Sequence, residues 1–157
     1  MRARDLAVPY PTVSVDTGAL EAARLIARER RPALIVCDAN GLPFTVLPGS
    51  QVLRFVVPVY VQDDPHLARA YDEQSSDEVT RRLGDRTVGD LLKGHPGSRD
   101  PDEIPIVDPD ATTIEIAAVM ARAHSPLVAV VEGGRVLGAV TASLLLDALL
   151  PTEQDPQ

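Results

Sequence analysis

The sequence has few aromatic residues, a single cysteine and no tryptophan. Phe, Trp and Tyr make up only 3% of its 157 residues, so aliphatic side chains must form any hydrophobic core. One cysteine, Cys37, excludes an internal disulfide and a cysteine-based metal site. Because it lies in the apolar run "ALIVC", we interpret it as a small buried side chain rather than a reactive thiol.

Long hydrophobic runs and basic stripes are also missing. Pro or Gly interrupts each apolar run before it reaches the ~20 residues that a membrane helix needs. The N-terminal residues lack the pattern of a signal peptide, so we expect a cytoplasmic protein without membrane insertion. The net charge of −8, without a basic stripe, argues against nucleic-acid binding.

The main feature that is present is an internal repeat. Residues 18–41 align with residues 112–134 after a one-residue gap at the turn, and the alignment continues downstream. The short lead "ARDLA" also resembles "VGDLL" of residues 88–92. The aligned pairs include Asp5 with Asp90, Leu20 with Ile114, Pro32 with Pro126, Gly41 with Gly134, Ser50 with Ser143 and Leu53 with Leu146.

Both copies carry the same order of structural signals. An extended piece, 12–15 or 104–107, precedes an Ala-rich helix that a proline ends. Thr112, with Glu115 three residues later, forms a capping box for the second of these helices. Two strands joined by a glycine-containing turn then follow, and a closing helix ends the copy. The sequence therefore predicts an α/β fold made of two tandem β-α-β-β-α units.

We divide the chain into a first copy at 1–57, a connector at 58–86, a second copy at 87–150 and a disordered tail at 151–157. The connector contains i,i+4 apolar pairs and predicts short helices, which either lie on the module or bind a partner. Residues 95–103 are rich in Gly, Pro and Asp and predict a loop.

Tandem β-α-β-β-α units with "D-L" leads, "P-x-x-V-V" strands and a closing "G-A-V-T" resemble a pair of CBS domains, a Bateman module of the stand-alone bacterial type. The resemblance implies two repeats packed about a pseudo-twofold axis and assembly into a homodimer. It also implies a regulatory module that binds AMP, ATP or S-adenosylmethionine between the repeats and needs no cofactor. The regulated protein, a transporter or an enzyme, is unknown.

The family pattern after the last strand of each repeat is Gly, two apolar residues, Thr or Ser, two variable residues and an Asp that binds the ribose. In the second copy Gly138 and Thr141 match this pattern, but Leu144 takes the place of the Asp. Gln51 takes that place in the first copy, where it retains an uncharged hydrogen bond to ribose. A hydrogen bond to a charged group contributes about 1.5–3 kcal/mol, so its loss weakens a ribose contact by roughly ten- to a hundredfold.

The remaining candidates are backbone groups, hydroxyls and one cation. Thr141 and Ser143, at the start of the closing helix, are suited either to phosphate binding or to capping that helix. Arg31 ends the first helix, where it either binds phosphate or complements the helix dipole. The complete predicted ligand set is Arg31, Gln51, Val107, Thr112, Pro126, Gly138, Val140, Thr141 and Ser143.

No pattern in the sequence indicates catalysis. The three histidines are far apart in sequence, no metal-ligand spacing is present and no nucleophile motif occurs. We therefore expect no metal site and no enzymatic activity. Two functions stay open: a sensor of adenosine compounds, and an interaction scaffold that has lost nucleotide binding.

Overall fold

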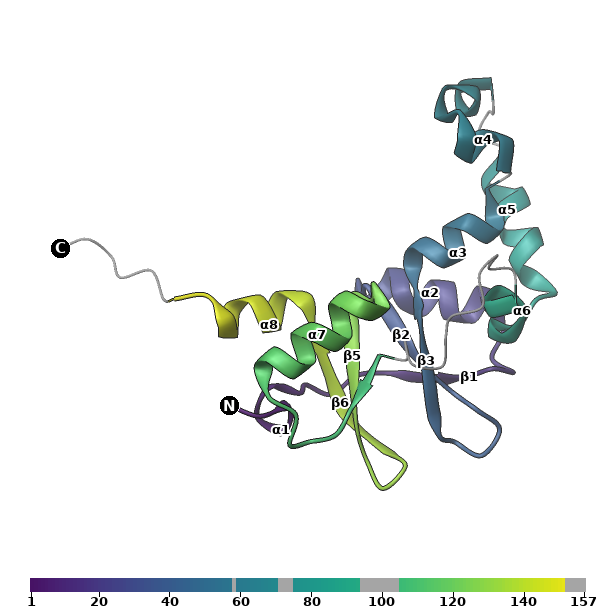
Figure 1. Ribbon diagram of the computed structural model, residues 1–157. Helices are drawn as coiled ribbons and strands as arrows, with labels where there is room; N and C mark the ends of the chain where they lie inside the picture. Colours follow the sequence, from purple (N-terminus) through teal and green to yellow (C-terminus); the bar gives the residue numbers. More distant parts are fainter. Residues whose placement is uncertain (58, 71–74, 94–104, 152–157) are drawn as a thin grey trace.

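The structure of the protein is a computed structural model that describes residues 1–57, 59–70, 75–93 and 105–151. It contains two three-stranded sheets with helices packed against them (Figure 1). The predicted loop at 95–103 and all but the first residue of the predicted disordered tail lie outside the described residues.

The first sheet has the strand order β1-β2-β3. Strand β1 (Thr12–Ser14) is parallel to β2 (Ala33–Cys37), and helix α2 (Ala19–Glu29) forms the crossover between them. Strand β3 (Pro43–Pro48) returns antiparallel to β2 and leads into α3 (Gly49–Val56). This is the predicted β-α-β-β-α order.

The second sheet repeats this arrangement in the order β4-β5-β6. Strand β4 (Ile106–Val107) is parallel to β5 (Leu127–Glu132), with α7 (Thr113–Ala123) as the crossover. Strand β6 (Arg135–Thr141) is antiparallel to β5, and α8 (Ala142–Leu149) closes the copy. The α/β class and its two tandem units are confirmed.

The predicted turn and cap signals have a conformational basis. Gly41 and Gly134 adopt φ angles of +81° and +79° in the two hairpin turns, a region that glycine enters without steric cost. The Thr112 hydroxyl accepts a hydrogen bond of 3.2 Å from the Glu115 backbone N–H and so caps α7.

The segment between the copies is helical. Helix α4 (Val59–Asp63) and the 3₁₀ helix η1 (Pro65–Ala70) extend away from both sheets (Figure 1). Helix α5 (Ser75–Gly84) instead packs against α2 and α3 and places Leu83 in the core of the first copy.

The short helix at the start of each copy in the sequence packs with the sheet of the other copy. Helix α1 (Ala3–Leu6) packs with the second sheet, where the Ala3 backbone N–H donates a 2.9 Å hydrogen bond to the carbonyl oxygen of Ala111. Helix α6 (Val88–Lys93) packs with the first sheet and contributes Val88 to its core. We call the first sheet with α2, α3, α5 and α6 the first lobe, and the second sheet with α1, α7 and α8 the second lobe.

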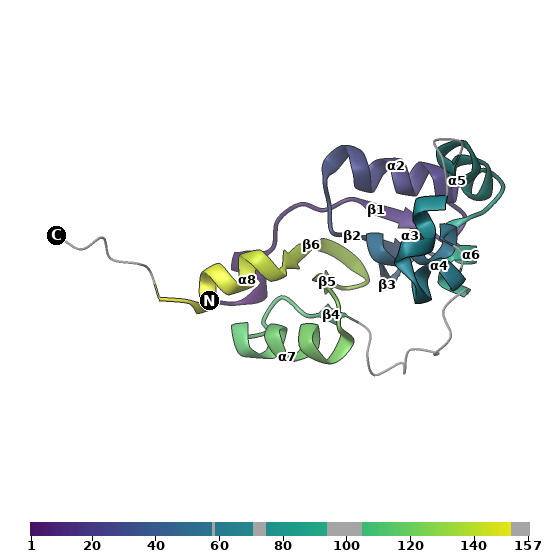
Figure 2. The ribbon, with the colours of Figure 1, turned by 90° about the horizontal axis from the view of Figure 1, so that it is seen from above.

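A third hydrophobic cluster joins the two sheets. Strands β2 and β3 of the first lobe pack against β5 and β6 of the second, and Figure 2 shows the lobes side by side from above. The contact is built from aliphatic side chains that are almost completely buried: Ala33, Ile35, Val46, Leu127, Ala129 and Ala139. The two lobes therefore share a hydrophobic core.

Candidate functional site

The structure brings several predicted ligand residues together at the start of α8. The Thr141 hydroxyl accepts a hydrogen bond of 3.3 Å from the Leu144 backbone N–H and lies 3.1 Å from the Ser143 hydroxyl. The carbonyl oxygen of Pro126 accepts a hydrogen bond of 3.1 Å from the Ala142 backbone N–H. We call this cluster the α8 corner. Its threonine already performs the capping function that the sequence offered as the alternative to ligand binding.

Apolar packing occupies the positions next to these hydroxyls. Leu144, at the place of the ribose carboxylate, is partly buried and packs against the core of the second lobe. Val140 is fully buried in the same core, and its backbone pairs with Val128 of β5, so this residue exposes no group to a ligand in this structure. The corner therefore offers hydroxyls and main-chain groups but no charge.

Gly138 and Val107 lie in one row across the second sheet, each opposite Val130 of the central strand. Outside β6 the chain passes close by, and the backbone groups of Val8 and Ala139 exchange hydrogen bonds of 3.0 and 2.9 Å. A Cβ atom on Gly138 would overlap the carbonyl oxygen of Val8. The glycine is therefore required by this close backbone approach, independently of any ligand.

Residues 7–11, which we call the strap, run from the second lobe to the first. The Tyr10 hydroxyl donates a hydrogen bond of 2.6 Å to the Ala33 carbonyl oxygen, and burial raises the pKa of this phenol above its usual value. The Arg31 guanidinium lies 4.7 Å from the centre of the Tyr10 ring, and its Nε is 3.4 Å from a carboxylate oxygen of Glu29. Arg31, predicted as a phosphate ligand, thus stacks on the strap in this structure.

Two predicted ligand residues lie apart from the α8 corner. Gln51 is only 7% exposed, and its side-chain amide donates a hydrogen bond of 3.1 Å to the Leu91 carbonyl oxygen, which ties α3 to α6. Thr112 is exposed at the start of α7 and pairs with Arg2 through an isolated β-bridge. The sequence alignment could not reveal either neighbour, because both come from the exchanged leading segments.

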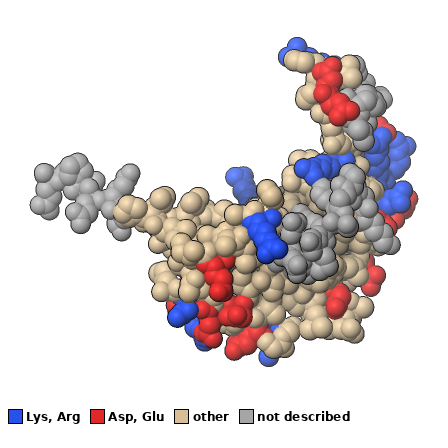
Figure 3. All heavy atoms as spheres, viewed as in Figure 1, with Lys and Arg blue, Asp and Glu red and all other residues tan. Residues whose placement is uncertain are grey.

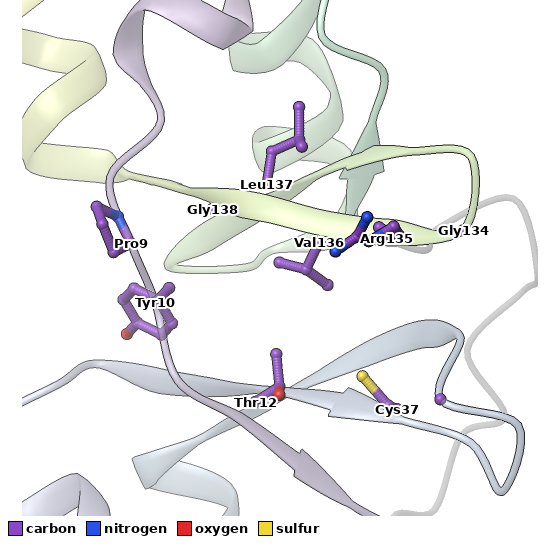
Figure 4. A pocket seen from close by; sticks show the side chains of 10 residues that line it. Pro9, Tyr10, Thr12, Cys37, Gly134, Arg135, Val136, Leu137 and Gly138 are labelled. Carbon is purple, nitrogen blue, oxygen red and sulfur yellow. The ribbon is translucent and has the colours of Figure 1, made fainter.

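An inter-lobe cleft that the sequence did not predict lies at the hairpin end of the strands. It has a volume of about 470 Å³, and we call it the hairpin cleft. Thr12, Cys37 and Val136 point into the space between β6 and the β1–β2 pair, whereas Leu137 points away (Figure 4). The lining residues are Pro9, Tyr10, Thr12, Cys37, Gly41, Gly134, Arg135, Val136, Leu137 and Gly138. Glycines aligned at 41 and 134 were the only signal available, and they indicated turns rather than a shared cavity.

Cys37 is the one nucleophilic sulfur in the sequence, and it lines this cleft. Burial, with a smaller effect from Asp38, raises the pKa of its thiol. A thiol held in its protonated form is a poor nucleophile and a poor metal ligand. Cys37 is partly exposed rather than buried as predicted, and its protonated thiol fits packing better than covalent chemistry.

Figure 3 shows where charges gather on one face of the molecule. Basic side chains gather around α5, acidic side chains mixed with a few basic ones gather on the second lobe, and isolated basic side chains lie between the two groups. This face thus lacks the continuous basic stripe that nucleic acids require. Within residues 1–57, 59–70, 75–93 and 105–151, no helix has the length and apolarity to cross a bilayer. In the same described parts, no three His, Cys, Asp or Glu side chains are placed to hold a metal ion.

Comparison with known proteins extends these observations. The family model of the CBS domain matches residues 100–151. A CBS domain-containing protein of unknown function from Kribbella flavida is 47% identical, with 95% of this chain and 98% of that chain covered and a TM-score of 0.77. The CBS domain of a membrane protein from Sphaerobacter thermophilus is 23% identical over 96% of this chain and 88% of that one, with a TM-score of 0.69.

A third solved structure carries a ligand. The protein CBSX2, described in complex with AMP, is 17% identical over 94% of both chains, with a TM-score of 0.61. At this identity the likeness concerns the fold alone. A search of curated proteins finds no match.

Proposed function

The chain belongs to the CBS-domain proteins, and on that premise we propose that it is a non-catalytic regulatory module that senses an adenosine-containing ligand between its two lobes. The observation that carries this proposal is the α8 corner, where two hydroxyls and a helix start lie beside the shared core of the lobes. A solved structure with the same fold is a complex with AMP, which supports the ligand class.

The proposed ligand is AMP, ATP or S-adenosylmethionine. The hydroxyls of Thr141 and Ser143, with the Ser143 backbone N–H at the start of α8, suit a phosphate or another polar group. Main-chain groups near Val107, Pro126 and Val140 suit the base. Since Leu144 supplies no carboxylate for the ribose, we expect weaker binding than in relatives that have one.

Regulation follows from the position of the site between two bodies. A ligand shifts a conformational equilibrium only by its difference in affinity for the alternative arrangements. We propose that a ligand bound at the α8 corner also reaches the strap or the first lobe, and so favours one placement of the lobes. We propose that a partner protein, an enzyme or a transporter, responds to that change.

We further propose that the module is a homodimer. Leu53 on α3 and Leu146 on α8 occupy aligned positions of the two copies and are 62% and 54% exposed. Large exposed aliphatic side chains at equivalent places of both lobes favour an apolar contact surface. A second copy has the same pair of leucines and suits a twofold-symmetric contact.

An interaction scaffold without a ligand is the second candidate. It is favoured by the two residues that replace the ribose-binding Asp of the family pattern, because both have structural contacts instead. Leu144 packs on the core of the second lobe, and Gln51 donates a hydrogen bond to α6. In that case the shared core and the exposed leucines serve assembly only.

Thermal unfolding with AMP, ATP and S-adenosylmethionine tests the proposal. A ligand at a hundred times its dissociation constant stabilises the folded state by about 2.7 kcal/mol. We expect at least one of the three to raise the Tm, and Ser143→Ala to reduce the increase. This serine is exposed and does not cap α8, so the variant keeps the fold. An unchanged Tm with all three compounds at millimolar concentration favours the scaffold.

A further inference from the structure

We propose that the hairpin cleft is a second binding site, separate from the α8 corner, for a small phosphorylated compound with a planar ring. The compound is of the size of a nucleoside monophosphate. Among the predicted ligand residues only Gly138 lines the cleft. The site therefore does not depend on the residues that carry the proposed function.

Both lobes build the walls of this cleft. Thr12 and Cys37 come from the first sheet, Arg135 and Val136 from the second, and Tyr10 from the strap between them (Figure 4). The volume of about 470 Å³ lies within the range of about 300–1,000 Å³ that is typical of small-molecule sites. A ligand here would contact both lobes at once.

The positive charge in the lining of the cleft favours an anionic ligand. Arg135 is the only charged residue among those that line it. Its side chain is exposed and forms no ion pair or hydrogen bond with any residue in the described part of the chain, while its backbone pairs with Glu132 of β5. A guanidinium without a carboxylate partner suits phosphate, which it binds through two parallel hydrogen bonds.

The opposite wall suits a planar ring. Tyr10 is held in place by its hydrogen bond to Ala33 and by the Arg31 guanidinium over its ring, so this aromatic wall is preformed. Pro9 and Val136 add apolar surface, and the Thr12 hydroxyl adds a hydrogen-bonding group. An apolar wall with a few polar groups that fix orientation is the usual composition of a ligand pocket.

The hairpin turns of the two lobes touch each other at one end of the cleft. A Cβ atom on Gly134 would lie 2.7 Å from Cδ2 of Leu42, which shows that the turns of the two lobes touch. Gly41, in the facing turn, has no atom within 4 Å of its Cβ position. The turns thus leave space beside their contact, and a bound ligand would hold them together.

Amide chemical shifts of ¹⁵N-labelled full-length protein test the site, with AMP and adenosine as probes. We expect saturable shifts of the Gly41 and Gly134 amides with AMP and much weaker binding of adenosine. Arg135→Gln should weaken AMP binding at these amides by about ten- to a hundredfold, because a hydrogen bond to a charged group is lost. Arg122→Gln, on an exposed arginine of α7 outside the cleft, is the matched control and should bind as the parent does.

The same spectra separate this proposal from the proposed function. Shifts at Thr141–Leu144 without shifts at Gly41 and Gly134 would overturn the hairpin cleft and support the α8 corner. Shifts at the glycines alone would support the cleft and contradict the corner. AMP binding that is equal in Arg135→Gln and Arg122→Gln would also overturn the cleft, and the spectrum of each variant reports whether it is folded.

Discussion

The hydroxyl of Tyr10 donates a 2.6 Å hydrogen bond to the carbonyl oxygen of Ala33, the first residue of β2. Two residues earlier, the backbone of Val8 pairs with Ala139 of β6. The strap is therefore bonded to one lobe at Val8 and to the other at Tyr10. Any change in the relative placement of the lobes must move or break one of these contacts.

Tyr10→Phe should lower the free energy of unfolding by about 1 kcal/mol, the usual contribution of one hydrogen bond. The phenylalanine ring still lies under Arg31, so the stacking contact is kept. Tyr10→Leu removes the ring as well and should cost about 0.5–1 kcal/mol more. Urea unfolding measures both values. Equal stability of the parent and Tyr10→Phe would show that the hydroxyl bond does not hold the strap.

The same tyrosine should make stability depend on alkaline pH. Burial raises the pKa of Tyr10 above its ordinary value of 10.0. Between that value and the higher folded-state pKa, the folded protein holds more protons than the unfolded chain, so stability falls as pH rises. Unfolding free energies measured from pH 9 to 11 should fall more steeply in the parent than in Tyr10→Phe. Cys37, whose pKa is also raised, titrates in both proteins, so the difference isolates Tyr10. Parallel curves would contradict the prediction.

Gly138→Ala should be one of the most damaging small substitutions in the second lobe. The added methyl group would overlap the backbone of Val8, and relieving the overlap requires the strap to leave β6. We expect a loss of about 1–3 kcal/mol, typical of overpacking. Gly84→Ala is the matched control, because no atom lies within 4 Å of its Cβ position in α5. Calorimetric Tm values that fall equally in both variants would show that the contact with Val8 is unimportant.

Local signals in the sequence predicted the secondary structure well. The capping box at Thr112 and the turn glycines at 41 and 134 act within a few residues, and the structure has the expected cap and turns. The repeat likewise predicted two equivalent β-α-β-β-α units. Caps and turns depend on interactions between residues that are close together in the sequence.

The exchanged leading helices and the hairpin cleft could not be predicted in this way. Helix α1 joins the second lobe through contacts such as Ala3 with Ala111, more than a hundred residues apart in sequence. Arg31 stacks on Tyr10 of the strap within the first copy, a contact that likewise depends on the tertiary fold. An alignment of the two copies compares equivalent positions, but it carries no information on which copy supplies the neighbour.

Gln51→Leu should reduce stability without changing ligand affinity. The side-chain amide is buried and donates to the Leu91 carbonyl oxygen, so its loss leaves a buried acceptor unpaired at a cost of about 1–3 kcal/mol. Gln62 also donates to backbone carbonyl oxygens but is exposed, and Gln62→Leu should cost less. Urea unfolding compares the two variants, and AMP titration of the folded Gln51→Leu protein checks affinity. A weaker AMP affinity in that variant would show that Gln51 contributes to ligand binding.

Leu144→Asp should strengthen the binding of AMP by about ten- to a hundredfold, since a carboxylate adds a charged hydrogen bond to the ribose. Position 144 is the third residue of α8 after the Thr141 cap, where an acidic side chain interacts favourably with the helix dipole, while the substitution removes the packing of Leu144 on the core. Leu144→Asn, of similar shape but without charge, is the matched control and should gain much less. Calorimetric titration with AMP gives both affinities. If Leu144→Asp folds and binds AMP no better than Leu144→Asn, the α8 corner is not arranged for a ribose, and the scaffold function is favoured.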